Sequence, residues 1–154
     1  METLLYESCK QMGVLLEQYQ LEQFLNYQNL LLQWNEKMNL TAITEKRDII
    51  LKHFADCVSI VSEISFEKDV SVIDVGTGAG FPGIPLKIAF PQLEIVLMDS
   101  LNKRVMFLQD VISELSLTKI SALHGRAEEI ARKPQFREQF DICVSRAVAN
   151  LSTL

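Results

Sequence analysis

Cysteine and histidine, from which many metal and catalytic sites are built, are scarce in this sequence. The 154 residues include three cysteines and two histidines. Cys9, Cys57 and Cys143 are odd in number, lie far apart and form no C-x-x-C pair. This pattern argues against a disulfide framework and against cysteine metal ligands, and it favours the reducing cytoplasm. We therefore predict no metal site and a cytoplasmic location.

Long apolar runs are also missing. No run approaches the roughly 18–20 residues that a membrane-spanning helix needs. The first residues, M-E-T-L-L-Y-E-S, begin acidic and lack the basic region of a secretory signal. With 48% hydrophobic and 23% charged residues, the composition is that of an ordinary soluble globular protein. These features predict a protein without membrane contact and leave its oligomeric state open.

Positive charge is in short supply overall. The net charge at pH 7 is −5, which argues against a general nucleic-acid binder. The acidic excess lies in residues 1–69, however, and basic residues outnumber acidic ones from Lys119 onward. A polyanion such as RNA would therefore meet the second half of the chain.

Glycine is rare, and four of the six glycines lie in one short stretch. Residues 70–85 read V-S-V-I-D-V-G-T-G-A-G-F-P-G-I-P. The β-branched run before the glycines is typical of a buried parallel strand, and the two prolines suit the first turn of a helix. A strand, a glycine turn and a helix N-terminus in this order let a ligand approach free backbone N–H groups closely.

The rest of the chain is organised around this stretch. Apolar residues spaced three and four apart predict three helices before it, over 3–17, 21–35 and 45–63, the last with Thr44 as its N-cap. Strands and helices alternate after it, which indicates βαβ units and a parallel sheet. The predicted strands cover 94–98, 119–124 and 140–144. The predicted helices run to Phe90, over 101–115, to about Arg132 and from 147 onward.

These elements predict an α/β fold with two parts. A helical extension over 1–65 ends in a linker at 65–69 and precedes a Rossmann-like domain over 66–154. The four strands of that domain would form half of a doubly wound parallel sheet, with Val144 at an open edge.

The glycine pattern alone fits more than one nucleotide. Gly78, Gly80 and Gly83 match the G-x-G-x-x-G of dinucleotide sites, so an NAD-dependent oxidoreductase is one interpretation. Asp74, however, precedes Gly76 at the mouth of the strand. A carboxylate there would repel a pyrophosphate and suit a ligand with a cationic group.

A second acid narrows the choice of ligand. Asp99 ends the next strand about 20 residues beyond the glycines, the position that binds ribose hydroxyls. A ligand with a ribose and a positive charge but no phosphate is S-adenosyl-L-methionine. Both acids also have structural alternatives, because Asp74 can cap a helix or turn and Asp99 can be the N-cap of the following helix.

Other polar residues have structural alternatives too. Glu128 stands where an acid stabilises a helix N-terminus. Arg146, at the carboxyl end of a strand, lies either beside a ligand or in solvent. His53 and Asp56, three residues apart, favour an exposed pair on a helix surface.

Five longer motifs occur in an order that is typical of one family. They are W-N-E-K-M-N-L-T at 34–41, H-F-A-D-C at 53–57, D-V-G-T-G-A-G-F-P-G-I-P-L at 74–86, D-S-L-N-K-R-V-x-F-L at 99–108 and V-S-R-A-V-A at 144–149. Together they resemble the RsmG family (older name GidB) of bacterial small-subunit rRNA methyltransferases. The resemblance covers nearly the whole chain and is far more specific than the glycines alone.

The resemblance implies a Rossmann-like S-adenosylmethionine-dependent methyltransferase fold and methyl transfer to N7 of a guanosine in 16S rRNA. Guanine N7 carries a free lone pair and no proton, so the transfer needs no general base and implies no catalytic residue. Family members continue past Leu154 to complete a seven-stranded sheet. We therefore expect a C-terminally truncated form, for which a non-catalytic cofactor-binding module is an alternative.

The resemblance also implies which residues form the site. With Asp74 added from the argument above, the cofactor residues would be Asp74, Gly76, Gly78, Phe81, Asp99, Ser100, Ala127, Glu128 and Arg146. The candidates for contact with 16S rRNA, or with the small ribosomal subunit, are His53, Arg126 and Arg146.

Overall fold

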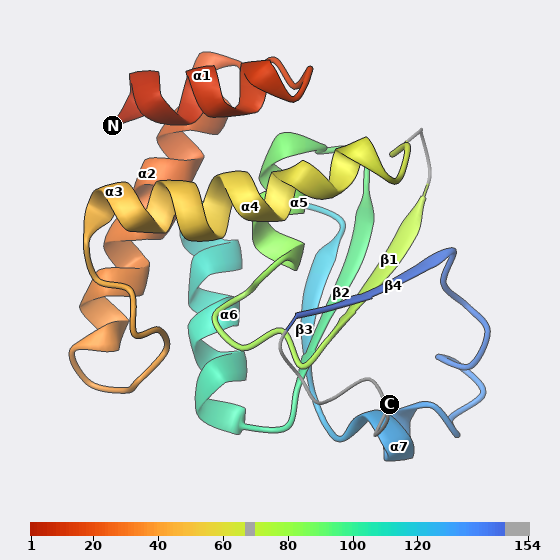
Figure 1. Ribbon diagram of the computed structural model, residues 1–154. Coiled ribbons are helices and arrows are strands. Elements are labelled where there is room, and N and C mark those ends of the chain that lie inside the picture. Colours follow the sequence, from red (N-terminus) through yellow and green to blue (C-terminus); the bar gives the residue numbers. More distant parts are fainter. Residues whose placement is uncertain (67–69, 147–154) are drawn as a thin grey trace.

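The computed structural model describes residues 1–66 and 70–146. Its N-terminal part is helical, and four strands alternate with helices after it (Figure 1). The strands are β1 (Ser71–Val75), β2 (Glu94–Asp99), β3 (Ile120–His124) and β4 (Ile142–Ser145). The helical elements are α1 (Glu2–Gln11), α2 (Gln18–Asn35), α3 (Lys46–Asp48), a π-helix (Ile49–Ala55), α4 (Asp56–Val58), a 3₁₀ helix (Ser59–Ser62), α5 (Gly83–Ala89), α6 (Asn102–Glu114) and α7 (Ala127–Ile130).

The four strands form one parallel sheet in the order β3-β2-β1-β4. Val75 of β1 lies opposite Met98 of β2 on one side and Ser145 of β4 on the other. The carboxyl ends of the strands therefore meet at one edge of the sheet, where open α/β sheets bind ligands. The predicted α/β sheet is confirmed. Among the described residues β4 is an edge strand of the sheet, which confirms the predicted edge position of Val144.

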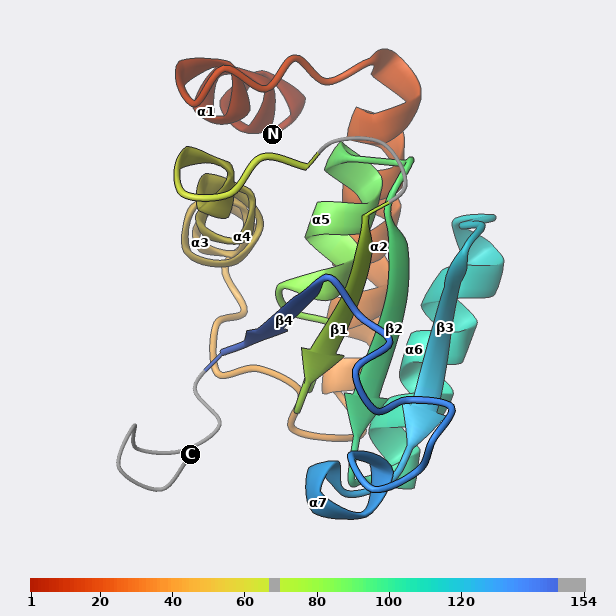
Figure 2. The same ribbon diagram turned by 90° about the vertical axis from the view of Figure 1, so that its right-hand side faces the viewer.

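Helices cover one face of the sheet. In Figure 2, α2, α5 and α6 lie behind the sheet, and α3 and α4 lie to the side of β4. Successive strand residues point to opposite faces. In the central strands β1 and β2, residues of both faces are buried, whereas the edge strand β4 is covered on one side. On β4, Val144 is buried against the core, whereas its neighbour Cys143 is exposed.

The N-terminal helices and the sheet share one hydrophobic core. Phe24 and Tyr27 of α2 and Phe54 of the π-helix are fully buried. Burial of each such side chain contributes about 1.5–3 kcal/mol. Gln20 of α2 also donates from its Nε2 to the carbonyl oxygen of Ile88, near the end of α5, at 2.7 Å. The helical segment therefore packs directly against the first helix that follows the glycine turn.

Two predicted helices differ from the structure. The helix expected over 3–17 ends at Gln11, because Gly13 turns the chain with a φ of +80°. The helix expected over 45–63 is present as a helical stretch, but its middle is a π-helix and its end is a 3₁₀ helix. Apolar spacing does not separate these types, because all of them place residues three to five apart on one face.

Smaller details complete the comparison. The N-cap of α3 is Glu45 rather than Thr44. The strands and helices predicted between 70 and 144 match the observed ends to within about two residues, as such boundaries usually do. The end of the predicted linker and the helix predicted from 147 onward lie outside the described residues. None of the helices in the described ranges is long and apolar enough to span a membrane.

Candidate cofactor and substrate site

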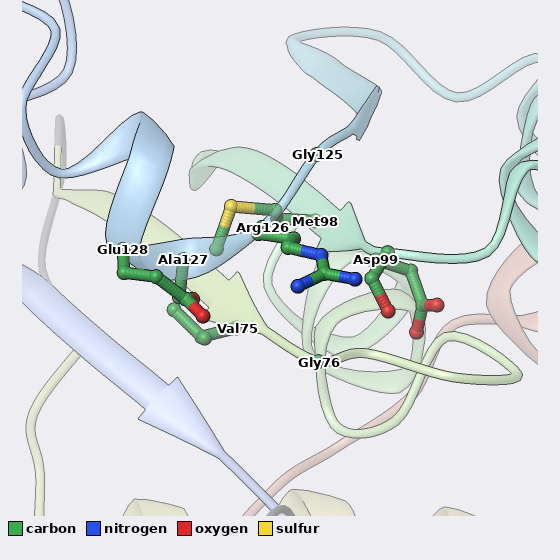
Figure 3. Close-up of a pocket in the computed structure, with 9 residues that line it drawn as sticks. Val75, Gly76, Met98, Asp99, Gly125, Arg126, Ala127 and Glu128 are labelled. Atoms are coloured by element: carbon green, nitrogen blue, oxygen red, sulfur yellow. The ribbon is translucent and has the colours of Figure 1, made fainter.

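A cavity of about 320 Å³ opens at the carboxyl ends of β1, β2 and β3 (Figure 3). Three short segments form its walls, and each of them lies at or directly after the end of a strand. The lining residues are Val75, Gly76, Met98, Asp99, Ser100, Gly125, Arg126, Ala127 and Glu128. We call this the strand-end cavity. Most of the predicted cofactor residues, and Arg126 from the predicted RNA contacts, are brought together here.

Asp99 is the most constrained side chain of the strand-end cavity. It is only 3% exposed. One carboxylate oxygen accepts from the N–H of Gly78 and the other from the N–H of Leu101, both at 2.9 Å. Arg104 of α6 lies 3.6 Å from the same carboxylate. These contacts fix the carboxylate of Asp99 in place. Because each of its oxygens has two lone pairs, the carboxylate can still accept hydrogen bonds from a ligand.

The turn after β1 requires glycine for its backbone. Gly76, Gly78 and Gly80 have φ angles of +65°, +59° and +98°, a region that other residues rarely adopt. A side chain at Gly80 would also meet Ile84 at 2.6 Å and the Tyr27 hydroxyl at 2.8 Å. The glycines therefore shape the turn, and Gly76 exposes its backbone to the cavity.

The structure places Asp74 beneath this turn and not in the cavity. Its side chain is fully buried, and its Oδ2 accepts from the Thr77 hydroxyl at 2.6 Å and from the N–H of Gly83 at 2.8 Å. Its Oδ1 has no hydrogen-bond partner within the described part of the chain. Burial raises the pKa of Asp74 to about 7. The expectation that this carboxylate lies at the mouth of the strand is therefore wrong, and its alternative role as a cap is what the structure shows.

Tyr27 supports the same turn from the N-terminal segment, a role that the sequence analysis did not predict. Its hydroxyl donates to the carbonyl oxygen of Ala79. Its ring packs between Phe54 and Phe81, with centroid distances of 5.3 and 5.9 Å. Burial raises the pKa of Tyr27 well above its ordinary value, so the hydroxyl keeps its proton. The sequence does contain a signal for this role, since Tyr27 lies on the apolar face of a predicted helix. A tyrosine that is buried there needs a hydrogen-bond partner for its hydroxyl.

A second group of predicted residues lies beside the turn. We call it the His53–Arg146 cluster. It consists of Thr41, Lys52, His53, Asp56, Cys57, Phe81 and Arg146. The His53 ring stacks on Phe81 with centroids 4.3 Å apart, and the Arg146 guanidinium lies 5.6 Å from the same ring. His53, Phe81 and Arg146 are therefore neighbours in space, but they do not line the strand-end cavity.

The predicted exposed pair of His53 and Asp56 is not observed. His53 is 9% exposed, and Asp56 pairs with Arg146 at 3.4 Å. Burial, and to a smaller extent the neighbouring Arg146, lowers the pKa of His53 to about 4. The imidazole is therefore neutral at pH 7. Helical spacing predicted the wrong partner, because it does not show that β4 brings Arg146 against this helix.

Thr41 is a further residue that the sequence analysis missed. Its Oγ1 lies 2.8 Å from Nε2 of His53. The loop that carries it is held by Asn35, whose Oδ1 accepts from the N–H groups of Leu40 and Thr41 at 2.8 and 3.0 Å. Thr41 ends the W-N-E-K-M-N-L-T motif and His53 begins the H-F-A-D-C motif. Their contact is formed by the fold, and no spacing rule predicts it.

Comparison with solved structures defines the class of fold. A protein-L-isoaspartate O-methyltransferase matches with a TM-score of 0.60 and 11% identity, over 94% of this chain and 47% of that chain. A putative S-adenosyl-L-methionine-dependent methyltransferase from Methanococcus maripaludis matches with a TM-score of 0.51 and 19% identity, over 69% of this chain and 51% of that chain. At these identities the likeness shows the fold, which is the Rossmann-like methyltransferase fold.

The family is narrower than the fold. The chain belongs to the GidB family, described as rRNA small subunit methyltransferase G, whose model matches residues 20–154.

Relatives with the name ribosomal RNA small subunit methyltransferase G occur in several bacteria. The protein of Lachnoclostridium phytofermentans is 55% identical over 148 residues, which are 96% of this chain and 61% of the relative. The protein of Clostridium tetani is 52% identical over 151 residues, which are 98% of this chain and 63% of the relative. The chain thus spans less than two thirds of the length of these relatives.

Proposed function

We propose that this chain binds S-adenosyl-L-methionine in the strand-end cavity and transfers its methyl group to N7 of a guanosine in 16S rRNA. Family membership and the names of relatives at 50–55% identity support the reaction. The observation that carries the proposal is Asp99, a buried and immobilised carboxylate that lines a cavity at the end of β2. A carboxylate at this position suits the hydroxyls of a ribose.

Neighbouring residues fit the other parts of such a ligand. Ser100 follows Asp99, and Gly76 also lines the cavity. Ala127 and Glu128, at the start of α7, line the part of the cavity next to the end of β3 and would flank the adenine. Gly78 acts indirectly, because its N–H holds the Asp99 carboxylate. These residues would bind and orient the methyl donor.

For the methyl transfer itself, the protein mainly needs to align the two reactants. Guanine N7 attacks the sulfonium methyl group with its own lone pair, the carbon–sulfur bond breaks, and no proton needs to be removed first. Catalysis then comes from holding nucleophile and methyl group in line and from excluding water. Arg126, which lines the cavity, and Arg146, at the end of β4, are the cations that we assign to contacts with the RNA. The substrate, free 16S rRNA or the small subunit, places this activity in the cytoplasm.

Calorimetry with S-adenosylhomocysteine tests the cofactor part of the proposal. The unmodified chain should bind one equivalent. Asp99→Ala removes the acceptor for the ligand and for the N–H groups of Gly78 and Leu101, so we expect at least tenfold weaker binding. NAD should give no thermal stabilisation. A chain that is folded by circular dichroism but binds no S-adenosylhomocysteine would refute the assignment of the cavity.

Asp141 provides a matched control for Asp99. Its Oδ2 accepts from the N–H of Ser71 at 2.9 Å, so it also fixes a backbone group of the sheet. Ser71 begins β1 and therefore lies at the opposite end from the cavity. Asp141→Ala should bind S-adenosylhomocysteine with unchanged affinity. Equal losses in both variants would show that Asp99 acts only through the stability of the sheet.

A further inference from the structure

Arg146 is held unusually firmly for a surface arginine. It follows β4 directly, and 32% of its side chain is exposed. Three groups from one helical stretch contact its guanidinium. NH2 donates to the carbonyl oxygen of Lys52 at 3.0 Å, NH1 donates to Cys57 Sγ at 3.3 Å, and Asp56 forms an ion pair at 3.4 Å. Lys52 lies within the π-helix, a feature that often marks functional segments.

The fourth contact of Arg146 determines the proton position on His53. NH2 of Arg146 lies 3.3 Å from Nδ1 of His53. A guanidinium has only donors, so Nδ1 must accept and the ring proton must reside on Nε2. Nε2–H then donates to Thr41 Oγ1 at 2.8 Å. Both ring nitrogens are therefore used within the protein, and the ring face lies on Phe81.

We propose that His53 is a positioning residue: with Thr41 it forms a relay that fixes the direction of Arg146, and Arg146 meets an acceptor group of the substrate RNA. The inference rests on the proposed function for the identity of the substrate. It removes His53 from the predicted RNA contacts, because a buried ring with both nitrogens engaged has nothing left to offer a ligand. It also adds Thr41 and the 36–44 loop to the residues on which RNA binding depends.

Two substitutions of His53 separate positioning from packing. The amide of asparagine lies near the place of Nδ1, so His53→Asn keeps an acceptor for Arg146. The amide of glutamine reaches the place of Nε2, so His53→Gln keeps only the contact to Thr41. We expect His53→Gln to raise the KM for 16S rRNA about tenfold and His53→Asn less than threefold. Neither variant should change kcat or the affinity for S-adenosylhomocysteine more than twofold.

Other outcomes of this comparison would overturn the relay. Equal increases of KM in the two variants would mean that the ring only packs or contacts RNA itself. A parallel loss of S-adenosylhomocysteine affinity would place His53 in the cofactor site. Arg146→Lys should raise the KM at least as much as His53→Gln, because lysine lacks the guanidinium fork.

The proton position is measurable without any activity. With two histidines in the chain, nitrogen-15 NMR of the imidazoles is simple to assign by using His53→Asn. We expect the Nε2–H form for His53, retained in Thr41→Ser and also in Thr41→Val, because Nδ1 still faces the donors of Arg146. A proton on Nδ1 in the unmodified chain would refute the relay. If the chain bound S-adenosylhomocysteine but methylated no RNA, the proposed substrate would fail, and this measurement would still decide whether His53 holds Arg146.

Discussion

The strand-end cavity and the His53–Arg146 cluster lie on either side of the glycine turn, but they are built in different ways. The cavity is open, it is lined by both polar and apolar residues, and its walls are short segments at the carboxyl ends of β1, β2 and β3. The cluster has a buried centre of His53, Cys57 and Phe81 and exposed members at its edge. It joins a loop after α2, the π-helix, the glycine turn and the end of β4. The cavity is therefore formed by residues close together in local motifs, whereas the cluster is formed by segments that tertiary packing brings together.

This difference assigns separate tasks to the two regions. An open cavity with one immobilised carboxylate suits a small ligand that enters and leaves. A packed cluster with satisfied hydrogen bonds suits a fixed orientation of one cation at the rim. The glycine turn connects them, and it rests on Asp74 from below and on Tyr27 from the side. Changes at these supports should therefore affect both regions, whereas changes at Asp99 or His53 should affect one.

The largest effect on stability and on binding is expected at Gly83, which packs against Asp74 beneath the glycine turn. Gly83→Ala would place a Cβ in steric conflict with Leu97 Cδ2 and 2.8 Å from Asp74 Oδ2. Such overpacking should lower the free energy of unfolding by about 3 kcal/mol, measurable by urea denaturation. It should weaken both S-adenosylhomocysteine binding and RNA binding.

Gly13→Ala is the control. Unlike Gly83, Gly13 has a positive φ of +80°, but no atom lies within 4 Å of the added Cβ. It should cost only about 1–2 kcal/mol and leave both ligands bound. An equal loss of stability in the two variants would contradict the tight packing beneath the turn.

The pH dependence of stability should identify Asp74. Its folded-state pKa of about 7 exceeds the value of 3.8 for a free side chain. The stability that this group contributes is therefore complete below about pH 4 and is lost as the pH rises to 7, with a slope of at most ~1.4 kcal/mol per pH unit. Asp74→Asn does not titrate and should remove that part of the slope between pH 4 and 7.

Asp141→Asn is a control in which the pH dependence of stability should change in the opposite direction. Hydrogen bonds from Ser71 lower the pKa of Asp141, so its contribution is present at neutral pH and lost toward acid. Denaturation curves must extend from about pH 2 to pH 7 to check both variants, because the contribution of Asp141 is lost only below its ordinary pKa of 3.8. The same slope in the Asp74→Asn variant and in the unmodified chain would show that Asp74 is ionised in the folded state.

A smaller effect is expected at Tyr27. Tyr27→Phe keeps the buried ring but leaves the carbonyl oxygen of Ala79 without its donor. The loss should be about 1 kcal/mol of stability and a few-fold loss of S-adenosylhomocysteine affinity, measured by denaturation and calorimetry. Unchanged cofactor affinity would show that the N-terminal helices support the cluster alone and not the cavity.

The residues of the strand-end cavity were easier to predict from the sequence than those of the His53–Arg146 cluster. The strand, the turn and Asp99 were predictable, because the residues that form the cavity lie at or directly after the ends of strands whose pattern is plain in the sequence. Asp74 was misplaced because its type and position suggest a ligand, whereas the backbone of the turn folds over it. Thr41, Tyr27 and the true partner of His53 were not predictable, because their contacts depend on how the N-terminal helices pack against α5 and β4.

Backbone NMR of the labelled chain during titration with S-adenosylhomocysteine tests the central claim most directly. The account predicts that amide shifts change in three segments, 76–78, 99–101 and 125–128, which lie at the ends of strands and contain residues that line one cavity. The amides of 141–143, at the amino end of the sheet, should stay unchanged. Shifts confined to other surfaces, or no shift in a folded chain, would contradict the assignment of the cavity to the methyl donor.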